Sequence, residues 1–89
     1  MNKTIKQSIW APDDVCPGVL NIFGKDCEIS LEPRPHYCDR GNYIAKIFPT
    51  GELARSLDNA DMFPRYYFDL DRAKLEIEAW LKKRGQWKE

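Results

Sequence analysis

The sequence has no excess of charge of either sign, because its 14 lysine and arginine residues match its 14 aspartate and glutamate residues. A protein that binds nucleic acid nonspecifically or lies on a membrane surface normally carries a basic excess, since lysine and arginine neutralise the phosphate field. Long apolar runs are also missing, and no stretch approaches the roughly 20 apolar residues that span a bilayer. The sequence therefore predicts no membrane partner and gives nucleic-acid binding no support from net charge.

Cysteine and histidine are scarce, with three cysteines and one histidine in 89 residues. An odd number of cysteines cannot all pair within one chain, which argues against a disulfide-stapled secreted scaffold. Residues 1–10 contain no apolar run of the length that a signal peptide needs. These features predict a protein of the reducing cytoplasm.

Glycine-rich phosphate loops, Ser–His–Asp spacing and the HExxH motif are absent from the sequence. One catalytic arrangement can be written from Cys38 as nucleophile, His36 as base and Asp39 as orienting group. Neighbours in a sequence seldom converge in space as such an arrangement requires. We therefore predict that the protein is not an enzyme and uses no cofactor.

One set of residues has the ligand types that tetrahedral zinc prefers. The set consists of Cys16, Cys27, His36 and Cys38. Structural zinc sites usually pair their ligands at Cys-x₂₋₄-Cys spacing, which these cysteines lack. Cys27 also shares an alternating face with apolar residues, where a thiol packs as a small hydrophobic side chain. Zinc binding is therefore the weaker interpretation of this set.

The sequence does contain several segments whose patterns predict short strands. Clean alternation over residues 26–31 and a glycine-containing turn predict a β-hairpin with residues 18–23. In this strand, one side is expected to carry Cys27, Ile29 and Leu31, and the other Glu28, Ser30 and Glu32. Residues 42–48 and 65–68 predict two further strands. The run at 52–57 predicts a strand that returns antiparallel after a Pro-Thr-Gly turn, although its spacing also fits one helical turn.

The clearest element is an amphipathic helix that Asp69 or Asp71 caps at its start and that Gly85 ends. Its apolar residues recur on one face at helical spacing: Leu70, Ala73, Ile77, Trp80 and Leu81. Together these elements predict an α+β fold, with an antiparallel sheet of four to five strands and this helix packed on one face.

The domain prediction is an N-terminal arm or irregular segment over residues 1–17, followed by a single α+β domain over residues 18–89. The arm is polar and rich in turn residues. Trp10 is its exception, because a lone tryptophan in a polar arm usually docks onto the domain, the alternative being an exposed interface anchor.

Arginine and aromatic residues gather around residues 34–43 and 65–67, beyond what a small core needs. The candidate binding residues are Arg34, His36, Tyr37, Arg40, Tyr43, Arg65, Tyr67 and Trp87. Arginine, tyrosine and tryptophan dominate the hot spots of protein interfaces. Trp87 follows the helix, and it either folds back over the sheet edge or is exposed to a partner.

The directions of the side chains in the strand at 65–68 determine which of these arginine and aromatic residues are exposed. We expect Tyr66 and Phe68 to face the helix. Arg65 and Tyr67 are then expected to lie outside.

The sequence has more arginine and aromatic residues than its core needs, and it lacks recognisable catalytic motifs. We therefore predict a small non-catalytic binding module that acts through a protein partner or as a homodimer. The alternative is single-stranded nucleic-acid binding through a Tyr/Arg face, where rings stack on bases and cations meet phosphates. Residues 48–52, followed by 64–71 and the amphipathic helix, resemble small bacterial or mobile-element proteins, a resemblance that implies no function.

Overall fold

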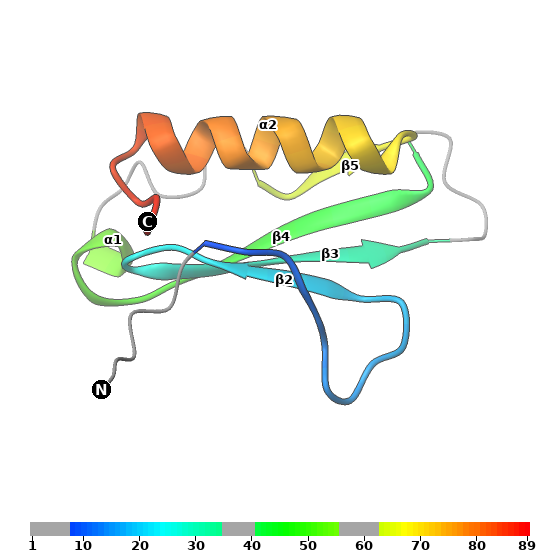
Figure 1. Cartoon of the computed structure of the whole chain (residues 1–89), viewed down its shortest axis with the longest axis horizontal. Helices are drawn as coiled ribbons and strands as arrows, with labels where there is room; N and C mark the ends of the chain where they lie inside the picture. The colour runs from blue at the N-terminus through cyan, green and yellow to red at the C-terminus, as the bar shows by residue number, and fades with distance from the viewer. Residues whose placement is uncertain (1–7, 35–40, 56–62) are drawn as a thin grey trace.

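The computed structural model describes residues 8–34, 41–55 and 63–89 (Figure 1). The described elements are β1 (Ala11–Pro12), β2 (Leu20–Phe23), β3 (Cys27–Pro33), β4 (Tyr43–Pro49), α1 (Gly51–Arg55), β5 (Arg65–Tyr67) and α2 (Leu70–Lys83). The strands form one sheet in chain order, and every neighbouring pair is antiparallel. Helix α2 lies along one side of this sheet. The predicted α+β fold, an antiparallel sheet with a C-terminal helix, is confirmed.

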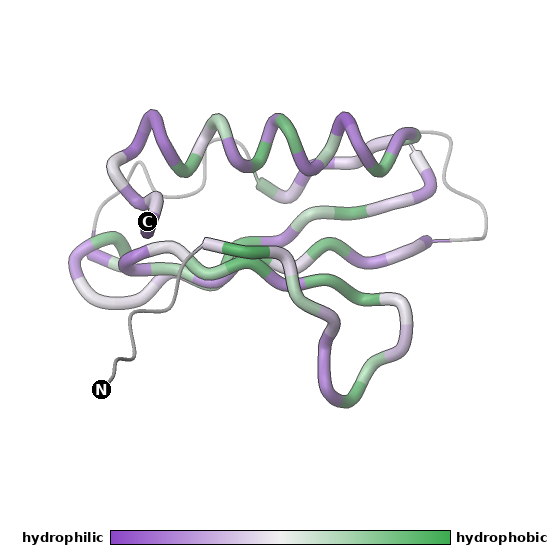
Figure 2. The backbone as a smooth tube through the Cα atoms, viewed as in Figure 1, coloured by the Kyte–Doolittle hydropathy of each residue, from purple (hydrophilic) through white to green (hydrophobic). Residues whose placement is uncertain are grey.

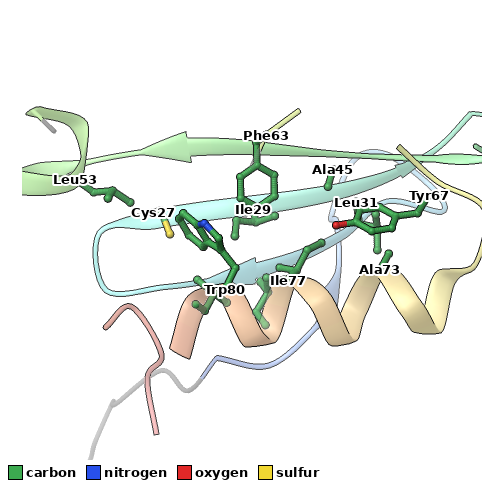
Figure 3. Close-up of a cluster of buried hydrophobic side chains, with 12 residues drawn as sticks. Cys27, Ile29, Leu31, Ala45, Leu53, Phe63, Tyr67, Ala73, Ile77 and Trp80 are labelled. Atoms are coloured by element: carbon green, nitrogen blue, oxygen red, sulfur yellow. The ribbon is translucent and has the colours of Figure 1, made fainter. Parts of the chain in front are cut away.

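Alternation along β3 separates its side chains between the two sides of the sheet, as predicted. Cys27, Ile29 and Leu31 are buried on the side of α2, and the residues between them point away. The buried core between sheet and helix consists of Ile22, Cys27, Ile29, Leu31, Ala45, Leu53, Phe63, Tyr67, Ala73, Ile77, Trp80 and Leu81 (Figure 3).

Helix α2 has the predicted start and the predicted apolar face. The carboxylate of Asp69 at the N-cap accepts a hydrogen bond from the backbone N–H of Asp71. Hydrophobic and hydrophilic residues alternate along the helix with its turns (Figure 2). Neither helix in the part of the chain that the structure describes is long and apolar enough to cross a membrane.

The C-terminal end of α2 is a Schellman motif. The N–H of Gly85 donates to the carbonyl of Lys82 at 3.2 Å, and the N–H of Gln86 donates to the carbonyl of Leu81 at 2.7 Å. Gly85 has a φ of +71°, a left-handed conformation that glycine adopts without steric cost. The predicted end of the helix at Gly85 is therefore confirmed.

We expect Gly85→Ala to lower the free energy of unfolding by about 1 kcal/mol, because alanine is strained at positive φ. A Cβ at this position has no atom within 4 Å, so the cost comes from the backbone alone. Urea unfolding followed by circular dichroism measures the change, with Lys83→Ala as the control in the same turn. An unchanged midpoint for Gly85→Ala would contradict the assigned role of the cap.

The predicted strand at 52–57 is wrong over its described part, which is the short helix α1. The N–H of Ala54 donates to the carbonyl of Thr50 at 3.1 Å, which closes one helical turn directly after β4. This turn places Leu53 in the core. The alternative that the spacing also fitted, one helical turn, is therefore the observed one, and it buries one leucine.

The described part of the N-terminal arm contributes an edge strand. Ala11 and Pro12 pair with the beginning of β2. Trp10 packs against the core, and its indole N–H donates to Oε2 of Glu78 on α2 at 2.8 Å. The expectation that Trp10 docks onto the domain is confirmed.

The approach of β5 to the chain before β4 requires a glycine. A Cβ on Gly41 would overlap with the backbone of Tyr67. Two residues further along the chain, Tyr43 pairs with Tyr67, and this pair belongs to the register between β4 and β5. The register in turn decides which side of β5 faces the core.

Residues near the two ends of the chain are hydrogen-bonded to each other beside the β2–β3 hairpin. The N–H of Ser8 donates to the carbonyl of Lys88, and the N–H of Lys88 donates to Oγ of Ser8, both at 2.9 Å. Ser8 Oγ donates to the carbonyl of Phe23 at 2.7 Å. The buried side chain of Gln86 accepts from the N–H of Asp26 at 2.6 Å. We call these contacts the terminal clamp.

Candidate functional site

The side of the sheet opposite α2 is the most distinctive surface of the described chain. We call this surface the open face. The strand register arranges its side chains in three cross-strand rows: Phe23–Glu28–Phe48, Asn21–Ser30–Lys46 and Glu32–Ile44–Tyr66. The sequence placed Glu28, Ser30 and Glu32 on this side of β3, and the structure confirms that placement.

The first row sets two exposed aromatic rings on either side of a carboxylate. Phe23 is 41% exposed and Phe48 is 51% exposed, and Glu28 lies between them on the central strand. Strand spacing places the backbones of the two phenylalanines about 10 Å apart. We call Phe23, Glu28 and Phe48 the aromatic–acidic row. Exposed aromatic rings grouped in this way are characteristic of interaction surfaces.

Glu28 has no ion-pair partner within 4.0 Å among the described residues. Lys46 lies in the neighbouring row, but its ammonium is 3.4 Å from the carboxylate of Glu32. Lys25 and Lys88 line a hollow of about 300 Å³ that also borders Glu28, and neither forms an ion pair with it. The charge of Glu28 is therefore available to a ligand.

The loop over residues 13–19 projects from the sheet on the side away from α2 (Figure 1). Asp13 holds it, because its Oδ2 accepts hydrogen bonds from the N–H groups of Val15 at 2.9 Å and Cys16 at 2.8 Å. Its Oδ1 accepts from Nδ2 of Asn21 at 2.8 Å. The bond from Cys16 contributes most to a lowered pKa of the Asp13 carboxyl. The loop is therefore fixed to the sheet beside the open face.

A cavity of about 220 Å³ lies between this loop and the sheet. It is lined by Asp13, Cys16, Val19, Asn21, Glu28, Ser30, Glu32 and Phe48. Ser30 is 6% exposed, and its hydroxyl has no hydrogen-bond partner in the described chain. Leaving a buried polar group unpaired costs about 1–3 kcal/mol. The cavity thus places an unpaired carboxylate and an aromatic ring beside a buried hydroxyl that has no hydrogen-bond partner in the described chain.

The predicted directions of the side chains in β5 are wrong. Tyr67 is 5% exposed and belongs to the core, although it was expected to lie outside. Phe68, expected to face the helix, is exposed. Tyr66 pairs with Ile44 and so lies on the open face, not on the side of the helix. Three consecutive aromatic residues show no alternation, and the pairing of Tyr43 with Tyr67 decided the side.

The burial of Tyr67 changes its chemistry as well as its accessibility. Desolvation raises the pKa of its phenol to about 12, and the nearby Glu76 carboxylate adds to the shift. Tyr43, another of the candidate binding residues, is half-buried on the same side of the sheet and packs against the core. Tyr43 and Tyr67 therefore do not form an exposed stacking platform.

Arg65 lies on the surface as predicted, but its charge is already engaged. Its guanidinium is 3.7 Å from Glu76 and 5.6 Å from the centre of the Tyr67 ring. Arg72 donates to the same carboxylate at 2.8 Å, and this bond is the first cause of a lowered pKa at Glu76. This cluster lies on the side of α2, away from the open face.

The remaining predicted binding residues are scattered or undescribed. Arg34 is exposed at the end of β3, and His36, Tyr37 and Arg40 lie outside the described residues. Trp87 is half-buried against the core, with the ammonium of Lys82 at 4.6 Å from its ring centre. Of the two alternatives for Trp87, the structure shows that it folds back onto the domain.

The proposed zinc ligands can be followed only in part. Cys16 is exposed, whereas Cys27 is buried and its pKa is raised to about 11, chiefly by desolvation. Protonated thiols are poor metal ligands. His36 and Cys38 lie outside the described residues. Within the described ranges, no three histidine, cysteine, aspartate or glutamate side chains are placed to hold a metal ion.

Comparison with known proteins gave no match to a family model, to a curated protein or to a solved structure.

The aromatic–acidic row was not among the candidates chosen from the sequence. Its signal was present, because Phe48 is in phase with Lys46 on the polar side of its strand, and Glu28 is in phase with Ser30. Two phenylalanines among polar residues on the exposed side of a sheet indicate an interaction surface. Their alignment with Glu28 depends on the register between strands, which one strand's pattern does not give.

Proposed function

We propose that this protein is a small binding module without catalytic activity, and that its open face binds a partner protein. The observation that carries the proposal is the uncovered aromatic–acidic row, with Phe23 and Phe48 exposed on either side of the unpaired Glu28. Phenylalanine is among the aromatic residues that are enriched in the cores of protein interfaces. The free thiols of Cys16 and Cys27 fit a reducing cytoplasm as the compartment.

Charge on the open face supports a protein partner over the predicted alternatives. Single-stranded nucleic acid is disfavoured, because its phosphates would meet Glu28, Glu32 and the aspartates of the loop. Of the Tyr/Arg residues that would bind nucleic acid, Tyr43 and Tyr67 pack in or against the core, and Arg65 is ion-paired on the helix side. A second copy of the open face would present Glu28 and Glu32 with only Lys46, which is already paired with Glu32, so a different protein is favoured as partner.

Single alanine substitutions in the row test the proposal. We expect Phe23→Ala and Phe48→Ala each to lower partner capture at least tenfold, because each removes an exposed ring that the partner would cover. Wild-type and variant proteins are immobilised, and captured proteins are compared by quantitative mass spectrometry. Leu75→Ala is the matched control, since Leu75 is 66% exposed on α2 and lies on the other side of the molecule.

Thermal unfolding of each variant separates loss of binding from loss of structure. Both phenylalanines are half exposed, so we expect only a small change in stability from either substitution. If Phe48→Ala captured the same proteins as the wild type at the same level, the open face would not be the binding surface.

A further inference from the structure

We infer that the open face recognises an arginine side chain of the partner, held over Glu28 between the rings of Phe23 and Phe48. This inference rests on the proposed function and names the chemistry of the group that the partner presents.

Charge complementarity indicates a cation. Glu28 has no ion-pair partner among the described residues, and the Lys46 ammonium is taken by Glu32. On the loop side of the row, a hollow of about 440 Å³ is lined by Asp13 and Asp14 as well as by Glu28, whereas Lys25 and Lys88 line the other hollow that borders Glu28. An anionic group entering from the loop side would be repelled by these carboxylates, whereas a cation would be attracted.

The exposed rings also suit a flat group. Phe23 and Phe48 lie on the same side of the sheet, with backbones two strand spacings, about 10 Å, apart. A guanidinium is planar and stacks on aromatic faces, whereas an ammonium acts as a compact point charge. The planar shape of the guanidinium therefore favours arginine over lysine.

The hydrogen-bonding capacity of a guanidinium also suits Glu28. A guanidinium carries five N–H donors, so one edge can bond both oxygens of the Glu28 carboxylate. Ser30, the next residue on the same side of β3, lines the same cavity of about 220 Å³, but its hydroxyl is buried and is not a contact of the ligand.

Nuclear magnetic resonance titration of the ¹⁵N-labelled full chain tests the inference with three probes. The probes are N-acetyl-arginine amide, its neutral isostere N-acetyl-citrulline amide, and N-acetyl-lysine amide. We expect saturable shifts for the amides of residues 21–32 and 46–48 with the arginine probe, at a Kd of about 1–10 mM. The citrulline probe should bind about tenfold more weakly, and the lysine probe about threefold more weakly.

Variants assign the binding to individual groups. We expect Glu28→Gln to weaken binding of the arginine probe about tenfold, and Phe23→Ala or Phe48→Ala about threefold each. Asp71→Asn removes one negative charge from α2 and serves as the control for Glu28→Gln. Leu75→Ala again controls for loss of an exposed apolar side chain.

Equal binding of the arginine and citrulline probes, shifts confined to other residues, or full affinity in Glu28→Gln would each overturn the inference. Absence of saturable shifts up to about 20 mM of the arginine probe would do the same. Partner capture that depends on Phe48 but not on Glu28 would leave the proposed function standing and the inference refuted. Arginine binding without any captured partner would leave an arginine site on the open face but refute the proposed function and the assignment of that arginine to a partner. A dimer that light scattering detects for the wild type and not for Glu28→Gln would mean that the arginine comes from a second copy of this chain, which would overturn the assignment to a different partner.

Discussion

Replacing Ile77 with alanine is expected to lower the free energy of unfolding by about 3 kcal/mol. Ile77 is 0% exposed near the middle of α2, and its side chain points into the layer between helix and sheet (Figure 3). The substitution removes three carbon atoms from a packed site and leaves a cavity that the neighbours fill only in part. A small domain has a total stability of about 5–10 kcal/mol, so this loss is a large fraction of it.

Urea unfolding at neutral pH, followed by tryptophan fluorescence, measures this effect. Leu75→Ala provides the matched control, because Leu75 lies on the same helix with its side chain in solvent. We expect the control to stay within about 0.5 kcal/mol of the wild type. A loss below about 1 kcal/mol for Ile77→Ala would mean that α2 does not contribute to the core as its burial indicates.

The second large effect is a loss of stability at alkaline pH. Burial raises the pKa of Cys27 from 9.0 to about 11 and that of Tyr67 from 10.0 to about 12. A raised pKa in the folded state means that the folded protein holds these protons more tightly than the unfolded chain. The resulting stability is fully present below about pH 9, and it is lost as the pH rises through 9–11 for Cys27 and 10–12 for Tyr67. By pH 11 the combined loss is on the order of 3 kcal/mol.

Thermal and urea unfolding between pH 7 and pH 11 test this expectation. Cys27→Ala and Tyr67→Phe should each flatten the fall of stability with pH, and the double variant should flatten it most. Cys16→Ala, which removes an exposed thiol, is the control and should keep the pH dependence of the wild type. A double variant that lost stability as steeply as the wild type would show that other groups cause the alkaline effect.

The parts of the fold that were predicted correctly are those with a long local pattern. Alternation at Cys27, Ile29 and Leu31 fixed both the strand and its buried side. The apolar spacing from Leu70 to Leu81 predicted α2, since one face of a helix has a period that a few turns are enough to reveal.

The parts that were predicted wrongly or not predicted are short elements, and their conformation depends on contacts with residues distant in the sequence. α1 is one turn, and the burial of Leu53 stabilises it. The edge strand at Ala11 and Pro12 has two residues and exists only because β2 pairs with it. The direction of Tyr67 follows from its pairing with Tyr43, which depends on the close contact at Gly41.

The candidate site shows the same division. The surplus of aromatic residues and arginine predicts a binding module, which stays a prediction, whereas alternation placed Glu28 on the exposed side of its strand. The meeting of Phe23, Glu28 and Phe48 in one row needs two registers at once, 23 with 28 and 28 with 48. Such registers are set by turn lengths and by packing against α2, which a single-sequence pattern does not contain.

The terminal clamp has a consequence for the order in which the chain folds. The hydrogen bonds between Ser8 and Lys88 join residues 80 positions apart. Closing a loop of that length from the unfolded chain costs roughly 4 kcal/mol of entropy, more than two hydrogen bonds return. The hairpins of the sheet join near neighbours and close at far smaller cost. The clamp is therefore a late event in folding, and it contributes more to slowing the unfolding rate than to speeding the folding rate.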